Sequence, residues 1–394
     1  MIYTFLIGSG FSVPAGLPTG KELNKRIRNA RELPIAFHTS GCIVTNIDGT
    51  KPDFGFPTLH DESFEFCMKL IDYYSKSHEF DYEEFYDYFV DLNRKASLQK
   101  QGKHLQKLYA FLPDSGYYLI NREKDKQGLH LYIQTGRLNH IYQELVNFLL
   151  LLPKSVDYSS YRGWCEYVKG LIEQGDVVNI YSLNHDTLIE ELMGENGMDR
   201  DFCDGFAADA SPYYGNVNGK DMALEFFANQ YDKPIRLHKL HGSVSYYLFN
   251  KEVGPSQLKA SNIVKRPSGL EDYDVFYADG NNRTSLTRGM LGMEADFLTG
   301  AVSKIRRYES PIYYKPQFDN FERDLQSTNQ LIVIGYGFKD ARVNEIIKNT
   351  IGDSTRSTII DPYISSTAKI AAINIFKKPE FIKQTISESF TSEF

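Results

Sequence analysis

The chain has 394 residues, of which 42% are hydrophobic and 24% charged, and its formal net charge is −7. This length predicts about two domains, and the acidic balance argues against direct binding of nucleic acid. The four scattered cysteines lack metal-ligand spacing, the N-terminus lacks a basic leader, and the most apolar stretch (145–152) is too short to span a bilayer. We therefore expect a cytoplasmic protein with no metal and no membrane partner.

The first predicted element is a buried strand over residues 2–7, an almost wholly apolar run. The segment Gly8-Ser9-Gly10-Phe11-Ser12 follows it directly, and a helix is predicted to begin near Thr19. We assign residues 1–35, together with 175–394, to one nucleotide-binding domain.

The middle of the chain loses the strand signal and shows apolar residues at helical spacing. Phe64, Met68 and Ile71 form one such set, and Leu138 and Ile141 belong to another. We interpret residues 55–172 as a mostly helical insertion domain, whose aromatic stripes are either core packing or a cover for the site.

Strands and helices alternate again after Gly175. Strands are predicted over 177–181, 235–240, 244–249, 330–334 and 357–360, and helices over 185–193 and after Asp340, a candidate cap. The turn-rich residues 250–310 are interpreted as an irregular excursion. Apolar strands followed by capped helices predict an α/β fold, a Rossmann-like mainly parallel sheet with helices on both faces.

Polar segments follow three of the predicted strands, at residues 8–12, 182–186 and 240–243. In open α/β sheets, ligands bind at the carboxyl ends of the strands, so we expect these segments to meet at one site. A Gly-rich turn lets the backbone approach a diphosphate. A tight structural turn would explain the same glycines equally well.

The second and third segments carry groups suited to catalysis. Asn184 and Asp186 flank His185 at a strand-to-helix turn, where helix capping would need only one of them. A neutral imidazole at His241 can accept a proton from a sugar hydroxyl near neutral pH, although a hydrogen-bonded structural histidine is the plain alternative. Strand periodicity places His238 on the opposite face, so the two histidines are a poor metal pair.

These segments together resemble the sirtuins. The run Gly8-Ser9-Gly10-Phe11-Ser12, continued by Gly16-Leu17-Pro18, looks like the sirtuin opening motif, and Ser182-Leu183-Asn184-His185-Asp186 looks like the Thr-Gln-Asn-x-Asp segment. Leu240-His241-Gly242 resembles the catalytic His-Gly. The segment Gly335-Tyr336-Gly337 resembles a later nucleotide-binding segment of the bacterial sirtuin-like branch, and Asp361 falls where that fold binds the adenosine ribose.

The departures from the sirtuins narrow the resemblance. Protein-deacylating sirtuins carry two Cys-x-x-Cys pairs that hold zinc, and this sequence has none. Their Asp-Phe-Arg after the Gly-Ile-Pro run is also missing, because Thr19 and Gly20 follow Pro18. The chain therefore resembles the zinc-free, sirtuin-like NAD hydrolases of bacterial anti-phage defence, and in particular the sirtuin subunit of sirtuin–HerA-type systems.

The resemblance implies that NAD is the substrate and is cleaved to nicotinamide and ADP-ribose, depleting NAD in abortive infection. It implies catalytic roles for Asn184 with ribose or water, Asp186 with the nicotinamide carboxamide, and His241 as the base. The implied nucleotide-binding residues are Gly8, Ser9, Gly10, Phe11, Ser12, Pro18, Ser182, Gly335, Gly337 and Asp361.

Two alternatives remain open at this point. The first alternative to an NAD hydrolase is an NAD-dependent protein deacylase without zinc. The second is a non-catalytic subunit of a defence complex that senses NAD or ADP-ribose. As partners, the resembling systems imply a homo-oligomer, a HerA-type ATPase or another separate regulatory protein.

Overall fold

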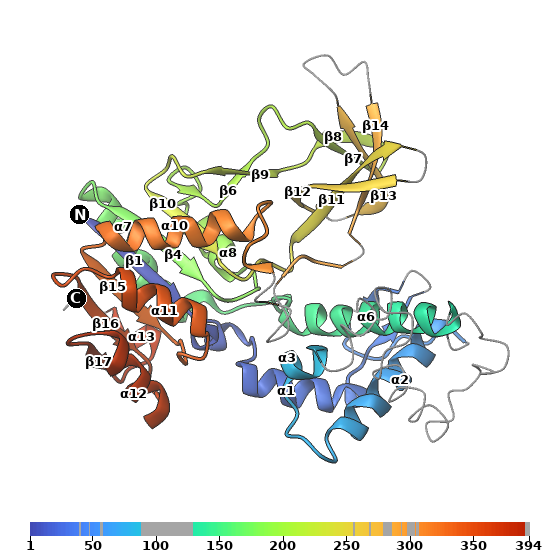
Figure 1. Cartoon of the computed structure of the whole chain (residues 1–394), viewed down its shortest axis with the longest axis horizontal. Helices are drawn as coiled ribbons and strands as arrows, with labels where there is room; N and C mark the ends of the chain where they lie inside the picture. The colour runs from blue at the N-terminus through green and yellow to red at the C-terminus, as the bar shows by residue number, and fades with distance from the viewer. Residues whose placement is uncertain are drawn as a thin grey trace. The chain divides into compact units, whose positions relative to one another are not determined.

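The computed structural model describes residues 1–38, 41–46, 48–55, 58–87, 129–254, 257–267, 269–278, 286–292, 294–297, 304 and 307–390. The chain divides into two compact units (Figure 1). Unit 1 comprises Met1–Thr19, Leu150–Phe297 and Tyr308–Phe394, and unit 2 comprises Gly20–Leu149 and Leu298–Arg307.

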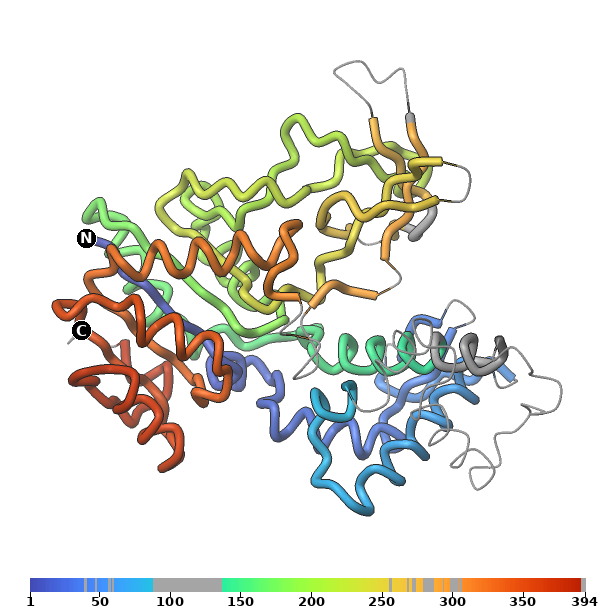
Figure 2. The backbone as a smooth tube through the Cα atoms, viewed as in Figure 1, coloured from blue at the N-terminus to red at the C-terminus, as the bar shows by residue number. Residues whose placement is uncertain are grey.

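Unit 1 is built on a seven-stranded sheet within the described residues, and every strand pair in it is parallel. Its order is β17 (Glu380–Ile382), β16 (Arg356–Ile360), β15 (Gln330–Ile334), β1 (Ile2–Ile7), β4 (Val177–Ser182), β10 (Ile235–Lys239) and β5 (Phe202–Cys203). Figure 2 shows the blue β1 between the green β4 and the red-orange β15. After β1, the chain adds β4, β5 and β10 on one side of β1, and then β15, β16 and β17 on the other side. The topological switch point therefore lies between β1 and β15.

The central strands are apolar along their length because helices cover both faces of the sheet. On one face, Phe5, Ile180 and Leu237 share a core with α7 (Arg162–Glu173), α8 (Leu188–Glu195) and α13 (Ile386–Ser389). The other face carries α10 (Tyr314–Ser327), α11 (Ala341–Thr350) and α12 (Ser366–Ile375), as Figure 1 shows. The Rossmann-like fold class predicted from the sequence is confirmed.

Unit 1 also holds an eight-stranded antiparallel sheet within the described residues. Its order is β6 (Gly205–Ala207), β9 (Phe226–Gln230), β12 (Gln257–Lys265), β11 (Tyr246–Gly254), β14 (Leu286–Leu291), β13 (Leu270–Ala278), β7 (Tyr213–Val217) and β8 (Lys220–Ala223). The irregular excursion predicted over 250–310 is therefore wrong for β11 to β14. These strands are partly exposed and broken by bulges, so their sequence lacks the continuous apolar runs of the parallel strands.

Unit 2 is mostly helical in its described part. It contains α1 (Gly20–Arg28), the short strands β2 (Ala36–Phe37) and β3 (Ile43–Val44), α2 (Leu59–Tyr74), α3 (Tyr82–Phe85) and α6 (Leu129–Leu150). Thr58 forms a capping box with Asp61 at the start of α2. Of the predicted insertion over 55–172, residues 88–128 lie outside the described residues, and α7 belongs to unit 1. None of the described helices has the length and apolar character needed to cross a membrane.

Candidate functional site

The glycine loop after β1 forms two 3-10 turns, Ser9–Phe11 and Val13–Ala15, rather than the start of an α-helix. Gly8 N donates to Ile334 O at 2.9 Å, and Gly10 N donates to Gly335 O at 3.0 Å. These backbone donors are therefore used within the chain, at the switch point of the sheet.

The glycines allow the loops after β1 and β15 to touch. A Cβ on Gly8 would lie 2.6 Å from Gly335 O. Gly335 has a φ of +60°, and a Cβ there would lie 2.5 Å from Gly10 Cα. A side chain at either position would force the loops apart. The structural-turn explanation of the glycine motif thus has direct support, whatever ligand the loop takes.

Asn184, Ser12 and Asp186 form one hydrogen-bonded junction, and all three are buried. Asn184 Nδ2 donates to Gly8 O at 3.0 Å and to Ser12 Oγ at 2.9 Å, and Ser12 Oγ donates to Asp186 Oδ2 at 2.8 Å. Asp186 Oδ1 accepts from the backbone N–H of Leu188, the first residue of α8. Asp186 thus serves the helix start, and the Asn184 side chain bonds to the glycine loop instead.

His241 lies in the turn after β10, where its side chain is 7% exposed. Its Nε2 is 3.0 Å from Asp340 Oδ2, and its ring centroid is 6.1 Å from that of His185. The backbone of Leu240 donates to Ser182 O at 3.0 Å, which joins the ends of β10 and β4. Both the His241 and the Asn184 segments therefore belong to the carboxyl edge of the parallel sheet.

The backbone conformation at position 242 requires a glycine. Its φ is +78°, and a Cβ there would lie 2.3 Å from Asp296 O. A glycine after His241 would also open the imidazole to a ligand, because it has no side chain. The structure instead gives it a role in the close approach of the Asp296–Phe297 backbone, with which it forms a bridge.

Two residues that sequence reasoning did not assign to the site lie within it. Asp340 was predicted only as a helix cap, which is confirmed because its Oδ1 accepts from Val343 N, but it also faces His241. Lys239 Nζ donates to Asp186 O and lies 3.1 Å from Glu190 Oε1. The sequence signal for Lys239 was a charged residue inside an apolar strand, at the position facing α8.

Lys239 is buried behind the Asn184–Asp186 turn, and the side chain of its partner Glu190 is 20% exposed. Burial raises the pKa of Glu190, and the neighbouring Lys239 ammonium opposes that rise. Each charge is therefore tolerated because the other is present.

The other predicted nucleotide-binding residues are spread over this edge and the core beneath it. Phe11 packs its ring 5.2 Å from Trp164, and its carbonyl accepts from Tyr161 OH, so its side chain belongs to the core. Ser182 Oγ accepts from Asn184 N at 3.1 Å. Pro18 is buried, Ser9 is partly exposed, and Gly337 is exposed. Asp361 Oδ1 accepts from Tyr363 N at 2.7 Å, and burial raises the pKa of its carboxyl group.

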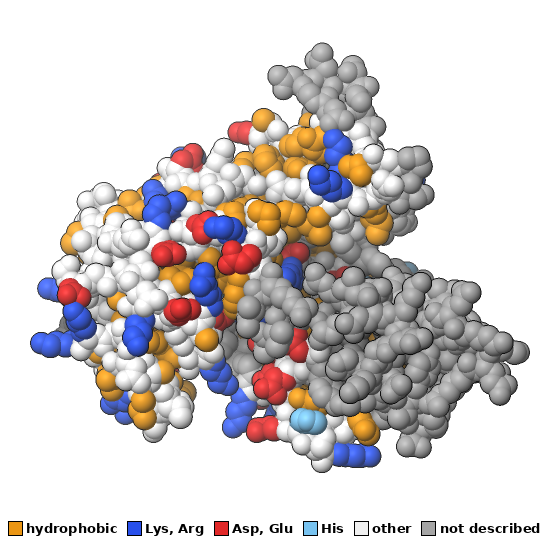
Figure 3. Space-filling model, viewed as in Figure 1, with side chains coloured by type: hydrophobic (Ala, Val, Ile, Leu, Met, Phe, Trp, Pro, Cys, Tyr) orange, Lys and Arg blue, Asp and Glu red, His pale blue; other side chains and the backbone are white. Residues whose placement is uncertain are grey.

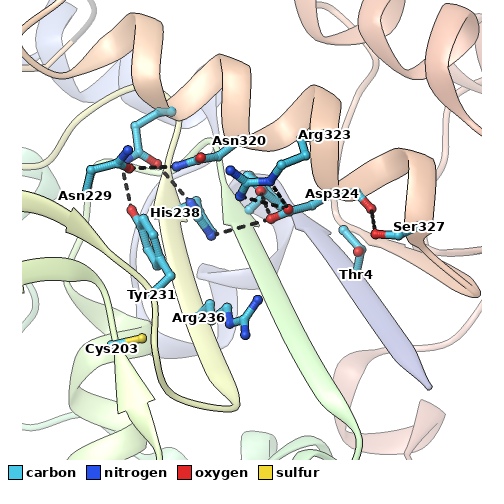
Figure 4. A network of polar contacts seen from close by, with 12 residues as sticks. Thr4, Cys203, Asn229, Tyr231, Arg236, His238, Asn320, Arg323, Asp324 and Ser327 are labelled. Carbon is cyan, nitrogen blue, oxygen red and sulfur yellow. Dashed lines mark hydrogen bonds and ion pairs between the residues drawn. The ribbon is translucent and has the colours of Figure 1, made fainter.

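His238 lies apart from the site, on the sheet face that α10 covers (Figure 4). It is fully buried between the rings of Tyr181 and Tyr231, with centroid distances of 4.4 and 3.8 Å. Its Nδ1 lies 3.1 Å from Gln317 Oε1, a hydrogen-bond distance. Its neighbours are thus aromatic and amide groups and the Asp324 carboxylate at 4.0 Å from Nε2, and no group of three metal-ligating side chains is found among the described residues.

A cavity of about 1100 Å³ lies at the opposite, amino edge of the parallel sheet. Tyr3, Gln330 and Arg356, at the starts of β1, β15 and β16, are among the residues that line it. Because His241 and the hydrogen-bonded junction of Asn184, Ser12 and Asp186 are at the carboxyl edge, we place the candidate site there, by its chemistry, rather than at this cavity.

On the face drawn in Figure 3, Lys and Arg side chains are interspersed with Asp and Glu side chains.

Residues 178–369 match the family model described as SIR2-like domain. The matched SIR2-like stretch contains Asn184, Asp186, His241 and Asp340, whereas β1 and its glycine loop precede it. No curated protein matches the chain.

Solved structures similar to this chain include Sir2 homologues. A mutant Sir2 homologue in complex with 2'-O-acetyl ADP ribose is 11% identical, with 99% of this chain and 88% of that chain covered and a TM-score of 0.35. A Sir2 homologue in complex with NAD is 10% identical, with 99% and 86% covered and a TM-score of 0.34. At these values the likeness carries no argument about activity.

Proposed function

We propose that the protein is an NAD⁺ hydrolase that cleaves the bond between nicotinamide and ribose, giving nicotinamide and ADP-ribose. One observation carries most of the support: the Asn184 amide bonds to both Gly8 O and Ser12 Oγ, and Ser12 bonds to Asp186. The amide, a carboxylate and the glycine loop are thus tied together at the edge where open α/β sheets bind ligands. The SIR2-like match over 178–369 supports the same conclusion.

In the proposed reaction, water adds to the anomeric carbon of the ribose while the carbon–nitrogen bond breaks. The bonding electron pair goes to the ring nitrogen of nicotinamide, and His241 accepts the proton that water or a ribose hydroxyl releases. The transition state is oxocarbenium-like, so positioning matters more than covalent chemistry. Asn184 positions the ribose or the water, and Asp186 holds the nicotinamide carboxamide.

The glycine loop needs a revised role in this proposal. Gly8 and Gly10 donate their N–H groups to the carbonyls of Ile334, at the end of β15, and Gly335, so they are not the donors for a diphosphate. We propose that the diphosphate lies along this loop through close approach to the glycine backbone, with Ser9 and the Gly335–Gly337 segment beside it.

The biological setting of the proposal rests on the sequence resemblance. We propose that NAD depletion serves anti-phage defence. We also propose that a homo-oligomer, a HerA-type ATPase or another regulatory protein restrains the activity.

The test is to incubate the purified protein with NAD and to quantify nicotinamide and ADP-ribose. Asn184→Ala and His241→Ala should each lower kcat/KM by on the order of a hundredfold or more, because each removes a group that acts in the transition state. Asn349→Ala and His78→Ala are matched controls, since both residues are exposed. Full activity in either site variant would remove its residue from the mechanism.

The same assay separates the two alternatives. An acylated peptide that is required for nicotinamide release, and that yields acyl-ADP-ribose, would identify a deacylase. Stabilisation of the protein by NAD or ADP-ribose with no nicotinamide release would identify a sensing subunit.

A further inference from the structure

Asp340 is shared between three partners at the N-terminus of α11. Its Oδ1 accepts from Val343 N at 3.0 Å, which caps the helix. Its Oδ2 accepts from Tyr308 OH at 3.0 Å and lies 3.0 Å from Nε2 of His241. Capping therefore uses one carboxylate oxygen, and the second is directed to the imidazole and a phenol.

The loop that carries Asp340 is held in place by its own contacts. Tyr336 OH donates to Asn344 Oδ1 at 3.0 Å and accepts from Asp340 N at 3.1 Å. Asn344 Nδ2 donates to Phe338 O at 2.8 Å. Phe338 has a φ of +53°, a left-handed conformation that a non-glycine residue adopts only where its surroundings hold it. This network fixes Asp340 before any ligand arrives.

The contact between Asp340 and His241 is buried, so water does not replace it readily. Their side chains are 8% and 7% exposed, and a carboxylate with so little access to water needs polar partners. Although His241 Nε2 and Asp340 Oδ2 are 3.0 Å apart, the Nε2–H points at an angle to the line between these two atoms, so the hydrogen bond is poorly aligned. Catalytic hydrogen bonds often have this geometry without substrate and tighten when substrate binds.

The partner of one imidazole nitrogen decides the chemistry of the other. A carboxylate that accepts from Nε2–H fixes the proton there and leaves Nδ1 as the basic nitrogen. It also stabilises the imidazolium that forms when Nδ1 takes a proton. A tyrosine hydroxyl on the same carboxylate oxygen limits how far that oxygen can move.

We propose that Asp340 is a positioning residue for His241, which it holds as the Nε2–H tautomer through Oδ2 while Oδ1 caps α11. The kinetic half of this inference rests on the proposed NAD hydrolysis, and the spectroscopic half does not. The loop after β15 then contributes to the base as well as to the nucleotide site.

The experiment compares two variants that keep a helix cap. Serine and asparagine are both favoured N-cap residues, so Asp340→Ser and Asp340→Asn retain the cap on α11. Serine has no second oxygen to reach His241. Asparagine keeps one oxygen for the cap and presents an amide N–H to His241 in place of Oδ2, so it favours the opposite tautomer. Denaturant unfolding should show that both variants remain folded.

The first readout is the ring N–H signal of His241 in ¹⁵N-histidine-labelled full-length protein, assigned by its loss in His241→Gln. We expect a downfield Nε2–H resonance that disappears in both Asp340→Ser and Asp340→Asn, because neither variant keeps an acceptor for Nε2–H once its oxygen caps α11. Its absence from the wild type, or its persistence unchanged in Asp340→Ser, would overturn the inference whether or not the protein cleaves NAD.

The second readout is the steady-state kinetics of NAD hydrolysis. Asp340→Ser should lower kcat by roughly tenfold to a hundredfold with little change in KM, because an orienting partner of a general base acts on the chemical step. Asp340→Asn should lower kcat at least as far, because an amide N–H that donates to Nε2 leaves the proton on Nδ1 and removes the base. An unchanged kcat in Asp340→Ser would refute the positioning role, while an inactive wild type that still shows the Asp340-dependent resonance would refute only the hydrolase.

Discussion

Asn184 and Asp186 lie at the same turn, but their side chains bind different parts of the structure. Both types are favoured at helix starts. Only Asp186 bonds to the first residue of α8, and the Asn184 amide bonds to Gly8 and Ser12. A buried amide placed away from the helix it precedes is not explained by capping. Its position beside the glycine loop is what makes it a candidate for substrate contact.

Lys239 provides a prediction at the same scale. Lys239→Met should destabilise the protein by about 3 kcal/mol, the low end for a buried ion pair, because Glu190, which is 20% exposed, would lose its counter-charge. The variant also loses the donor to Asp186 O. Lys169→Met on the exposed side of α7 is the control, with an expected change within about 0.5 kcal/mol. Urea unfolding measures both.

A double variant separates the ion pair from the backbone contact. Lys239→Met with Glu190→Leu removes both charges, so it should recover most of the stability that the single change loses. NAD hydrolysis should be lower than in the wild type in both the single and the double variant, since both lack the donor to Asp186 O. A double variant no more stable than Lys239→Met alone would mean that the pair is not the source of the loss.

At the scale of elements, the parallel strands were the readily predicted part of the fold. β1 and β15 have the bounds expected from sequence, and β4, β10 and β16 differ by one residue at one end. They are predictable because burial on both faces makes each a continuous apolar run that ends in a polar turn. The predicted convergence of the three polar segments at one edge follows from the same property.

The antiparallel sheet and the Asp340–His241 contact were not predicted. β12 and β13 mix charged and apolar residues, and the first four residues of β12 are exposed, so only pairing with other strands identifies the two as strands. Asp340 could be recognised as a cap from local sequence. Its contact with His241 depends on the order of β10 and β15 in the sheet, which short-range patterns do not encode.

The network that joins β10 to α10 leads to a prediction about pH. Burial lowers the pKa of His238 to about 3, and the hydrogen bond with Gln317 only partly opposes that effect. Asp324 Oδ2 lies 4.0 Å from Nε2 of His238 (Figure 4). Tyr181 and Arg323 already bond to that carboxylate. His238 is therefore neutral in the folded protein at every pH where the unfolded chain would begin to protonate it.

The sign of the effect follows from linkage. Between about pH 6.5 and pH 3 the unfolded state binds a proton at His238 that the folded state does not, so acid lowers the free energy of unfolding. The slope should reach about 1.4 kcal/mol per pH unit from this group. His238→Gln should remove that part of the slope, measured as the difference between wild type and variant in denaturant unfolding. His78→Ala, at an exposed position, should not change the slope in the same way.

At the scale of the whole molecule, the chain enters unit 1 with β1, continues into unit 2 and returns for the rest of the sheet. Unit 1 therefore cannot form its central strand pair, β1 with β4, until the intervening unit has been synthesised. All the residues of the candidate site belong to unit 1. A ligand of that site should accordingly stabilise one unit directly and leave the other to respond only through coupling between them.

The single tryptophan makes this testable. Trp164 is the only tryptophan in the chain, and it is fully buried in unit 1 against Phe5 and Phe11. Its fluorescence should follow the unfolding of unit 1, while far-UV circular dichroism follows the helices of both units. ADP-ribose at about a hundred times its Kd should stabilise the fluorescence-detected transition by about 2.7 kcal/mol. The dichroism signal should then split into a shifted and an unshifted part. Transitions that coincide in both probes and shift together would show that the two units unfold as one, because only strong coupling passes the full binding free energy from one unit to the other.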